Sequence, residues 1–285
     1  MTTQTTTVLP AVGDPDVAVD VPTAFRPYPV GPGIDVIPAY LPVPGMGVLP
    51  ANSYLIHGRE PVLVDAGPGG AADGFAAALS SVVDPADIRW LWLTHTDPDH
   101  IGGLAWLLDA APDMRIVTTY LAVGKMGLHQ PLPMDRLWWC NPGERVRTGD
   151  RELVALRPPS FDAPETTALH DPASGTLFSA DSFGALLGSP AVTADEVAPA
   201  DLEDGLVLWS TIDSPWLGRV DRTAFDRSLR DVDQLGAVRV LSAHLPPATA
   251  MTGDLLRWMA QVPDADPWVG PDQAALEHIL AQTRA

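Results

Sequence analysis

The most informative segment of the chain is LTHTDPDHIGG, residues 93–103. Within six residues it carries four side chains of the kinds that bind metal ions, which are His95, Asp97, Asp99 and His100. An apolar run at 88–94 predicts a buried strand before them, and the pattern at 103–110 predicts a helix after them. We therefore expect the four side chains on a strand-to-helix loop, where open α/β sheets place their sites.

The spacing inside this segment favours a metal site over simple helix capping. His95, Asp97 and Asp99 alternate, so an extended backbone turns all three side chains to one side. Pro98 keeps Asp97 out of the helical region. Capping would account for one aspartate, but it leaves His95 at the end of an apolar strand unexplained. We interpret the segment as metal-binding.

The rest of the chain alternates short β-rich runs with helical patterns, which is typical of an α/β layered protein. Two predicted hairpins, 53–65 and 167–181, share one plan, in which each ends a buried strand in an aspartate, Asp65 or Asp181. This similarity indicates two related halves packed as a sandwich. The histidines at the turns of these hairpins are assigned structural roles, namely His57 and His170.

Composition excludes several classes of function. The 285 residues include 17 basic and 36 acidic side chains, and the net charge of −19 disfavours nucleic acid and anionic membranes as partners. No apolar stretch is long enough to span a bilayer, and no signal peptide is apparent, so we expect a cytoplasmic protein. Cys140, the single cysteine, excludes an intrachain disulfide. We expect a flexible tail over 1–25 and a single domain over 26–285.

The motifs resemble those of the metallo-β-lactamase fold superfamily. Residues 94–103 resemble the signature T-H-x-[H/E/D]-x-D-H-x-G-G, and Val64-Asp65-Ala66-Gly67 resembles the upstream V-D-x-G. Phe178-Ser179-Ala180-Asp181 and Ser242-Ala243-His244 resemble the two later ligand segments. The resemblance covers about residues 34–250. It implies an α/β fold, the αββα sandwich of two mixed β-sheets flanked by helices.

The residue at position 97 points to a subclass. Dizinc hydrolases of this fold carry His there, whereas flavodiiron and oxygen-binding diiron proteins carry a carboxylate, as Asp97 is here. The segment around Pro164-Glu165-Thr166 also resembles the diiron proteins, with Asp162 where a ligand His is usual. The resemblance implies that Asp181 bridges two metals and that Asp65 supports the loop. The implied ligands are His95, Asp97, Asp99, His100, Asp162, Asp181 and His244, with no catalytic residue beyond them.

This ligand set contains three imidazoles and four carboxylates. Four negative charges neutralise two divalent cations, and oxygen-rich shells favour hard cations, whereas imidazole-rich shells suit zinc. We therefore predict two iron ions, Fe2+ or Fe3+, with zinc or manganese as alternatives. Because Asp97 is one methylene shorter than the family's Glu, one metal position could be weaker or empty.

The resemblance implies a non-haem diiron protein that binds or reacts with O2, as an oxidoreductase, an oxygen sensor or an oxygenase. The chain ends about 40 residues after His244, too few for the flavodoxin domain of flavodiiron enzymes, so electrons are expected from a separate donor protein. The alternatives are a dinuclear zinc hydrolase of an ester, thioester or phosphoester, and a binding protein on a degenerate site. The expected partners are O2 or a small molecule, and a homodimer is possible.

Other polar and aromatic residues are interpreted as surface, loop or packing residues. The stretch 189–215, which includes Asp195, Glu196 and Asp213, is predicted to be a solvated loop over the site. Four large side chains could wall a dry metal pocket or pack in the core, namely Met126, Met134, Trp138 and Trp139. Two further histidines are read as surface residues, His129 and His278.

Overall fold

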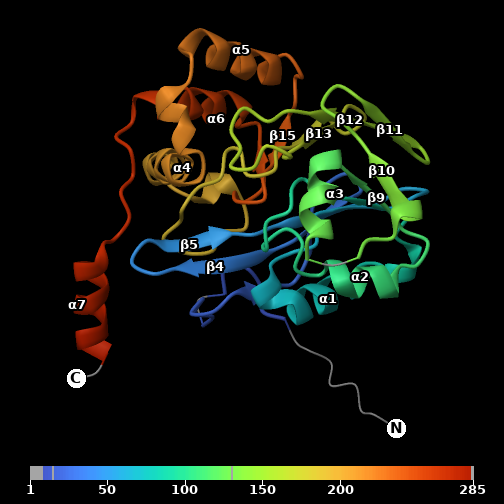
Figure 1. The fold of residues 1–285 in the computed structure, drawn as a ribbon, viewed down its shortest axis with the longest axis horizontal. Coiled ribbons are helices and arrows are strands. Elements are labelled where there is room, and N and C mark those ends of the chain that lie inside the picture. The colour runs from blue at the N-terminus through green and yellow to red at the C-terminus, as the bar shows by residue number, and fades with distance from the viewer. Residues whose placement is uncertain (1–8, 15, 130, 284–285) are drawn as a thin grey trace.

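A computed structural model describes residues 9–14, 16–129 and 131–283. The described residues form two mixed β-sheets packed face to face, with helices on their outer faces (Figure 1). This is the αββα sandwich that the sequence predicts. No helix of the described residues is long and apolar enough to cross a membrane.

The larger sheet comes from the first half of the chain and, within the described ranges, has seven strands. Their order is β10 (Leu137–Trp139), β9 (Arg115–Thr118), β8 (Trp90–Trp92), β7 (Val62–Val64), β6 (Ser53–Ile56), β3 (Ile34–Ile37) and β2 (Tyr28–Gly31). The strands from β10 to β7 are parallel, and those from β7 to β2 are antiparallel. The parallel strands end at one edge, where sites of open α/β sheets lie.

The second sheet comes from the later half and has six strands among the described residues. Their order is β11 (Arg145–Thr148), β12 (Arg151–Leu156), β13 (Ala168–Asp171), β14 (Thr176–Phe178), β15 (Arg239–Leu241) and β16 (Ala248–Thr249). Only the pair of β14 and β15 is parallel within this sheet. A small antiparallel sheet joins β1 (Thr23–Ala24), β4 (Ala39–Val43) and β5 (Gly47–Pro50).

Helices cover the outer face of each large sheet. Buried side chains of the first three helices pack on the larger sheet, and those of the next three pack on the smaller one. The last helix stands apart at the end of an extended segment in Figure 1. The helices are α1 (Ala72–Ser80), α2 (Leu104–Ala110), α3 (Tyr120–Gly127), α4 (Pro199–Asp213), α5 (Arg222–Asp233), α6 (Thr252–Met259) and α7 (Gln273–Thr283).

The core between the two sheets is apolar and aromatic. Trp92 from one sheet and Phe178 and Leu241 from the other are almost completely buried there. Burial of such apolar side chains is the main source of stability, because each aromatic ring among them removes about 150–250 Å² of surface from water. The metal-type residues lie beyond the ends of the strands that carry these side chains.

Two expectations differ from the structure. The stretch 189–215 is not a solvated loop, because its second half forms α4, with Leu202 and Leu206 fully buried. Pro199 and Pro215 lie at the borders of this helix and do not interrupt it. Pro199 occupies the first turn, where its missing N–H costs nothing. Within the tail expected over 1–25, Val12 and Phe25 are buried, while residues 1–8 lie outside the described residues.

Candidate metal centre

The ligand loop between β8 and α2 is joined by its backbone to the segment that follows β7. Ala66 N donates to His100 O at 2.7 Å, and Gly103 N donates to Ala66 O at 2.8 Å. Gly102 has no room for a side chain, because a Cβ there would lie 2.2 Å from Gly69 N. The two glycines that end the motif are therefore required by a backbone-to-backbone contact that fixes the loop.

Asp65 connects this loop to the sheet beneath it. Its Oδ1 accepts from Thr94 N at 2.8 Å, and its Oδ2 lies 2.9 Å from His100 Nδ1. Its backbone has φ +60°, a strained conformation for a residue other than glycine. The carboxylate contacts the loop and not the centre of the cluster. Its supporting role, predicted from the sequence, is compatible with this position.

Each of the three predicted histidine ligands is oriented by a contact at its Nδ1 atom. His100 Nδ1 contacts Asp65, and His244 Nδ1 donates to Pro50 O at 2.6 Å. His95 Nδ1 lies 3.1 Å from Thr94 Oγ1, whose own proton is directed at Asp65 Oδ2. Such outer contacts fix the ring orientation and leave Nε2 to face a metal.

The three Nε2 atoms converge on Asp181. His95 Nε2 lies 3.1 Å from Asp181 Oδ2, while the Nε2 atoms of His100 and His244 lie 3.1 and 3.2 Å from Oδ1. The Asp181 side chain is 2% exposed. Despite these short distances, Asp181 Oδ1 and His100 Nε2 are buried with no hydrogen-bond partner. Buried polar atoms are rarely left unpaired in proteins, and a bound cation would satisfy both.

The predicted ligands fall into two groups on either side of Asp181. One group contains His95, Asp97 and Asp162, and in each group the possible ligand atoms lie within 4.8 Å of one another. The other group contains Asp99, His100 and His244, and Asp181 forms further such groups with members of both sets. All seven predicted residues are thus brought together, in an arrangement that suits two cations sharing one carboxylate. Binding of metal by each of them stays a prediction.

The loops that carry Asp181 and Asp162 are joined by hydrogen bonds between serines. Ser160 N donates to Ser182 Oγ at 3.0 Å, and Ser182 Oγ donates to Ser160 O at 2.7 Å. Ala180 and Phe183 have φ values of +52° and +68°, so the backbone around Asp181 is held in an unusual conformation. This arrangement places two carboxylates from one sheet opposite the histidines of the other.

The buried cluster brings ionisable imidazole and carboxylate side chains close together, and this shifts their pKa values. Burial disfavours the charged form of His244, but Asp181 and Asp99 outweigh it and raise its pKa to about 9. The carboxylates near His100 likewise raise the pKa of that imidazole well above its ordinary value. Burial also opposes ionisation of Asp181, yet the three imidazoles hold its pKa well below the usual range. The carboxylates therefore favour the protonated form of these imidazoles, and a bound cation would compete with those protons.

Asp162 lies at the edge of the cluster and behaves differently. Its side chain is 27% exposed, and its Oδ1 lies 3.9 Å from His95 Nε2. Burial, together with the charges of Asp181 and Asp97, raises its pKa to about 6. This carboxyl is therefore only loosely paired with imidazole, at the position where an imidazole ligand is usual in the family that the sequence resembles.

Two residues of α4 join the site, although sequence reasoning placed this stretch in a solvated loop. Asp213 forms a further group of possible metal ligands with Asp162 and Asp181, within 4.8 Å of one another. The ring of Trp209 lies 5.2 Å from the ring of His244. The spacing of Trp209 and Asp213, four residues apart, was the available signal, because such residues share one face of a helix.

Most of the residues that were proposed to wall the metal pocket lie on the surface of the protein. Met134, Trp138 and Trp139 are 61%, 42% and 51% exposed, so they do not enclose the cluster. Met126 is buried, and with Asp97 it lines a cavity of about 520 Å³ beside the ligand loop. The aromatic side chain found against the cluster is instead Trp209.

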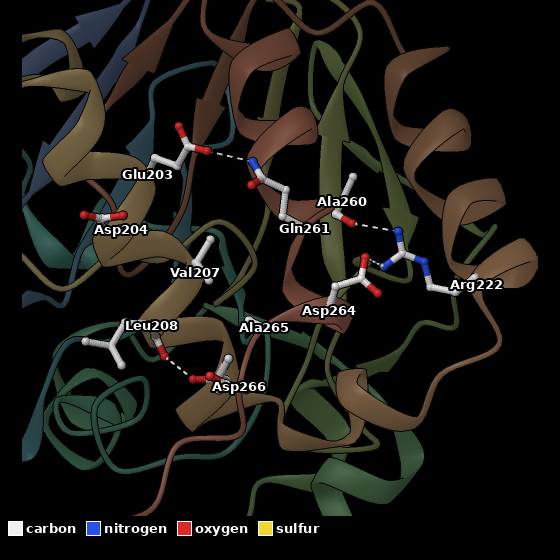
Figure 2. Close-up of a pocket in the computed structure, with 11 residues that line it drawn as sticks. Glu203, Asp204, Val207, Leu208, Arg222, Ala260, Gln261, Asp264, Ala265 and Asp266 are labelled. Carbon is white, nitrogen blue, oxygen red and sulfur yellow. Dashed lines mark hydrogen bonds and ion pairs between the residues drawn. The ribbon is translucent and has the colours of Figure 1, made fainter.

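A larger cavity of about 710 Å³ lies away from the cluster, between α4 and the segment after α6 (Figure 2). Gln261 Nε2 donates to Glu203 Oε1 across it at 2.7 Å, and Arg222 pairs with Asp264 at 3.3 Å. Of the described residues that line it, none is a predicted ligand. Size therefore does not identify the site in this molecule; the convergence of ligand atoms does.

Comparison with known proteins agrees with this geometry. Residues 46–187, about half of the chain, match the family model of the metallo-beta-lactamase superfamily. The chain thus carries a metallo-beta-lactamase superfamily domain. More particularly, its fold matches the cores of flavodiiron proteins, which confirms the family resemblance predicted from the sequence. One such structure, rubredoxin oxygen:oxidoreductase from Desulfovibrio gigas, superposes with a TM-score of 0.73 at 17% identity over 85% of this chain and 63% of that one.

Curated relatives are similar over a shorter region. The putative diflavin flavoprotein A 1 of Thermosynechococcus vestitus is 31% identical over 47% of this chain and 24% of its own length. The anaerobic nitric oxide reductase flavorubredoxin of Salmonella typhi is 29% identical over 53% of this chain and 32% of its own length. The chain therefore spans about a quarter to a third of these relatives, and their activities are not transferred to it by similarity alone.

Proposed function

We propose that this chain is a non-haem diiron protein that reacts with O2 or a similar small oxidant, using electrons from a separate donor protein. The observation that carries the proposal is the pair of ligand groups beside the buried Asp181, whose Oδ1 has no hydrogen-bond partner. The carboxylate at Asp97 gives the set more oxygen than imidazole ligands, which suits iron better than zinc. Similarity to flavodiiron cores supports the same assignment.

The names of the relatives indicate the class of substrate. One is named an oxygen:oxidoreductase and another a nitric oxide reductase. Both names refer to diatomic gases, and a small uncharged molecule needs no charged binding pocket. We propose O2 as the substrate of this chain because a carboxylate-rich centre favours the ferric state that O2 produces.

The residues of the chain have distinct parts in this function. Asp181 would hold both ions, His95, Asp97 and Asp162 one of them, and Asp99, His100 and His244 the other. When bound, the iron pair would supply electrons by cycling between the ferrous and ferric states. Asp65 and Thr94 keep the rings of His95 and His100 turned to the centre. The buried rings of His95, His100 and His244 would shield bound ions from bulk water on the side of the histidines.

The experiment is metal analysis followed by a reaction with O2. Protein produced in iron-rich medium should contain near two iron ions per chain and little zinc. After anaerobic reduction, exposure to O2 should produce ferric near-ultraviolet absorption within minutes. Asp181→Ala, which removes the shared ligand, is the control that should give neither iron nor absorption.

The same experiment also tests the alternative hypothesis of a zinc hydrolase. Stoichiometric zinc with negligible iron, no response of reduced protein to O2, and turnover of ester or thioester substrates by the zinc form would overturn the proposal. Asp97→His exchanges a hard anionic ligand for an imidazole. This variant should bind relatively more zinc and oxidise more slowly than the unmodified chain.

A further inference from the structure

One face of α4 packs against the segment that follows Asp181 and, towards the end of the helix, reaches the metal cluster. Gly205, Trp209 and Asp213 follow at intervals of four residues and so share this face. At Gly205 a Cβ would lie 2.2 Å from Leu186 O, so the helix touches the backbone of the segment after Asp181. Trp209 then packs against His244, and Asp213 comes next. The helix cannot slide without disturbing these contacts, so Asp213 is held in place.

The surroundings of Asp213 are unfavourable for a carboxylate in the metal-free protein. One contact favours the charged form, because Asp213 Oδ2 accepts a hydrogen bond from Ser214 Oγ at 3.0 Å. Two features oppose the charged form. A ligand atom of Asp213 lies within 4.8 Å of those of Asp162 and Asp181, which are two more carboxylates. Asp213 is the last residue of α4, where the helix dipole is negative and disfavours an anion. A cation among these three carboxylates would reverse each of these costs.

A second observation indicates that a ligand belongs in this place. Asp181, the member of the group that both metal positions share, is 2% exposed, and its Oδ1 has no hydrogen-bond partner. One of the three carboxylates is therefore buried and carries an oxygen without a hydrogen-bond partner, which a bound cation would supply.

We propose that Asp213 is a further carboxylate ligand of the metal centre, at the position formed by His95, Asp97 and Asp162. This inference rests on the proposed metal centre and adds a residue from α4 to it. With Asp181 the position then has one nitrogen and four oxygen donors, whereas the position formed by Asp99, His100, His244 and Asp181 has two of each. The first position is thus selective for a hard ion, iron or manganese, over zinc.

Charge balance leads to a second expectation for iron. Five carboxylates exceed the charge of two divalent ions by one, and they equal the charge of one divalent and one trivalent ion. Removing the charge of Asp213 should therefore make the centre easier to reduce. A ligand role for Asp213 therefore predicts an effect on the reduction potential, whereas a purely structural residue would have no such effect.

The test compares the unmodified chain with Asp213→Asn, Asp213→Ala and the control Asp204→Asn. Asp204 is an exposed residue of the same helix, and its substitution makes the same chemical change. Titration with Mn2+ and with anaerobic Fe2+ gives the affinity of each of the two ions. We expect Asp213→Asn to weaken one of them by at least about tenfold, Asp213→Ala to weaken it further, and Asp204→Asn to leave both unchanged. Zn2+ affinity should change less than Mn2+ affinity.

Two further measurements separate ligation from a structural role. The metal-free Asp213→Asn protein should melt at the same temperature as the unmodified chain or higher, because repulsion from two carboxylates is relieved. The midpoint potential of its iron form should rise. Unchanged affinities and potential in both Asp213 variants would overturn the inference while leaving the metal centre intact, as would a metal-free protein that is less stable but binds both ions normally. Failure of the unmodified chain to bind iron or manganese would overturn the proposed centre and this inference with it.

Discussion

Asp181 is the residue on which the two ligand groups depend. It contacts all three histidines, which belong to loops after β8 and β15, from a loop after β14. Its neighbours Ala180 and Phe183 have positive φ values, a conformation that costs of the order of 1–3 kcal/mol for such residues and persists where the surroundings enforce it. The position of this carboxylate is therefore maintained against a local cost, as is common at functional sites.

The first prediction follows from the positions of two carboxylates, since Asp181 lies beside both ligand groups and Asp162 belongs to one of them. Asp181→Ala removes an oxygen from both metal groups, so this variant should lose nearly all bound metal. Asp162→Ala affects one group and should retain about half. Elemental analysis of the two purified variants makes the comparison, with circular dichroism as the check that both are folded. Equal and full metal content in both would show that the ligands are wrongly assigned.

At the residue scale, the seven predicted ligands are brought together because each lies in a local motif that ends a strand. The segment 93–103 was recognised from its own residue types, whereas Asp162, Asp181 and His244 were assigned because their motifs resemble those of a known family. Asp213 could not be found in this way. It ends a helix, and its meaning depends on how α4 packs against Leu186 and His244, which no local pattern reveals.

Among the elements, the two predicted hairpins are confirmed, whereas one long helix was missed. The hairpins β6–β7 and β13–β14 agree with the predicted ones because apolar runs and turn residues specify them directly. In contrast, α4 was interpreted as loop because Pro190, Pro199 and Pro215 were taken as interruptions. Two of these prolines lie just at the borders of the helix, and the third precedes it.

The glycines of the ligand loop give a prediction at the element scale. In Gly102→Ala the new Cβ would lie 2.2 Å from Gly69 N and 2.4 Å from Pro68 C, both backbone atoms that cannot move separately. We expect a loss of about 1–3 kcal/mol in the free energy of unfolding, with weakened metal binding as the loop shifts.

Chemical denaturation with and without metal measures both effects. The matched control is Gly124→Ala, within α3, where nothing lies within 4 Å of a Cβ. That control should stabilise the protein by up to about 1 kcal/mol, because alanine is the better helix former. If Gly102→Ala behaved like this control, the contact between the loop and residues 68–69 would not be essential.

Across the whole molecule, the charges of the cluster predict opposite pH dependences with and without metal. The folded pKa of His244, about 9, lies above its unfolded value near 6.5. Its contribution to stability is therefore complete below pH 6.5 and is lost as pH rises through 9, on the order of 3 kcal/mol. The raised pKa of His100 acts in the same direction.

Metal must displace these protons, so metal affinity should rise over the same interval. Scanning calorimetry from pH 6 to 9 should show the melting temperature of metal-free protein falling, and the increase caused by metal growing. A metal effect that shrinks as pH rises would contradict the assignment of His100 and His244 as ligands.

The division of the chain between the two large sheets also divides the centre. One sheet is built from residues before the exposed turn at 141–144, and the other from residues after it. Four predicted ligands belong to the first half, and three belong to the second, together with Asp213. Bound metal would therefore link the two halves of the chain, including the two fragments that cleavage within the turn would produce. After cleavage within the turn, chelation should loosen their association and added metal should restore it, so this architecture is a natural scaffold for a metal-controlled split protein.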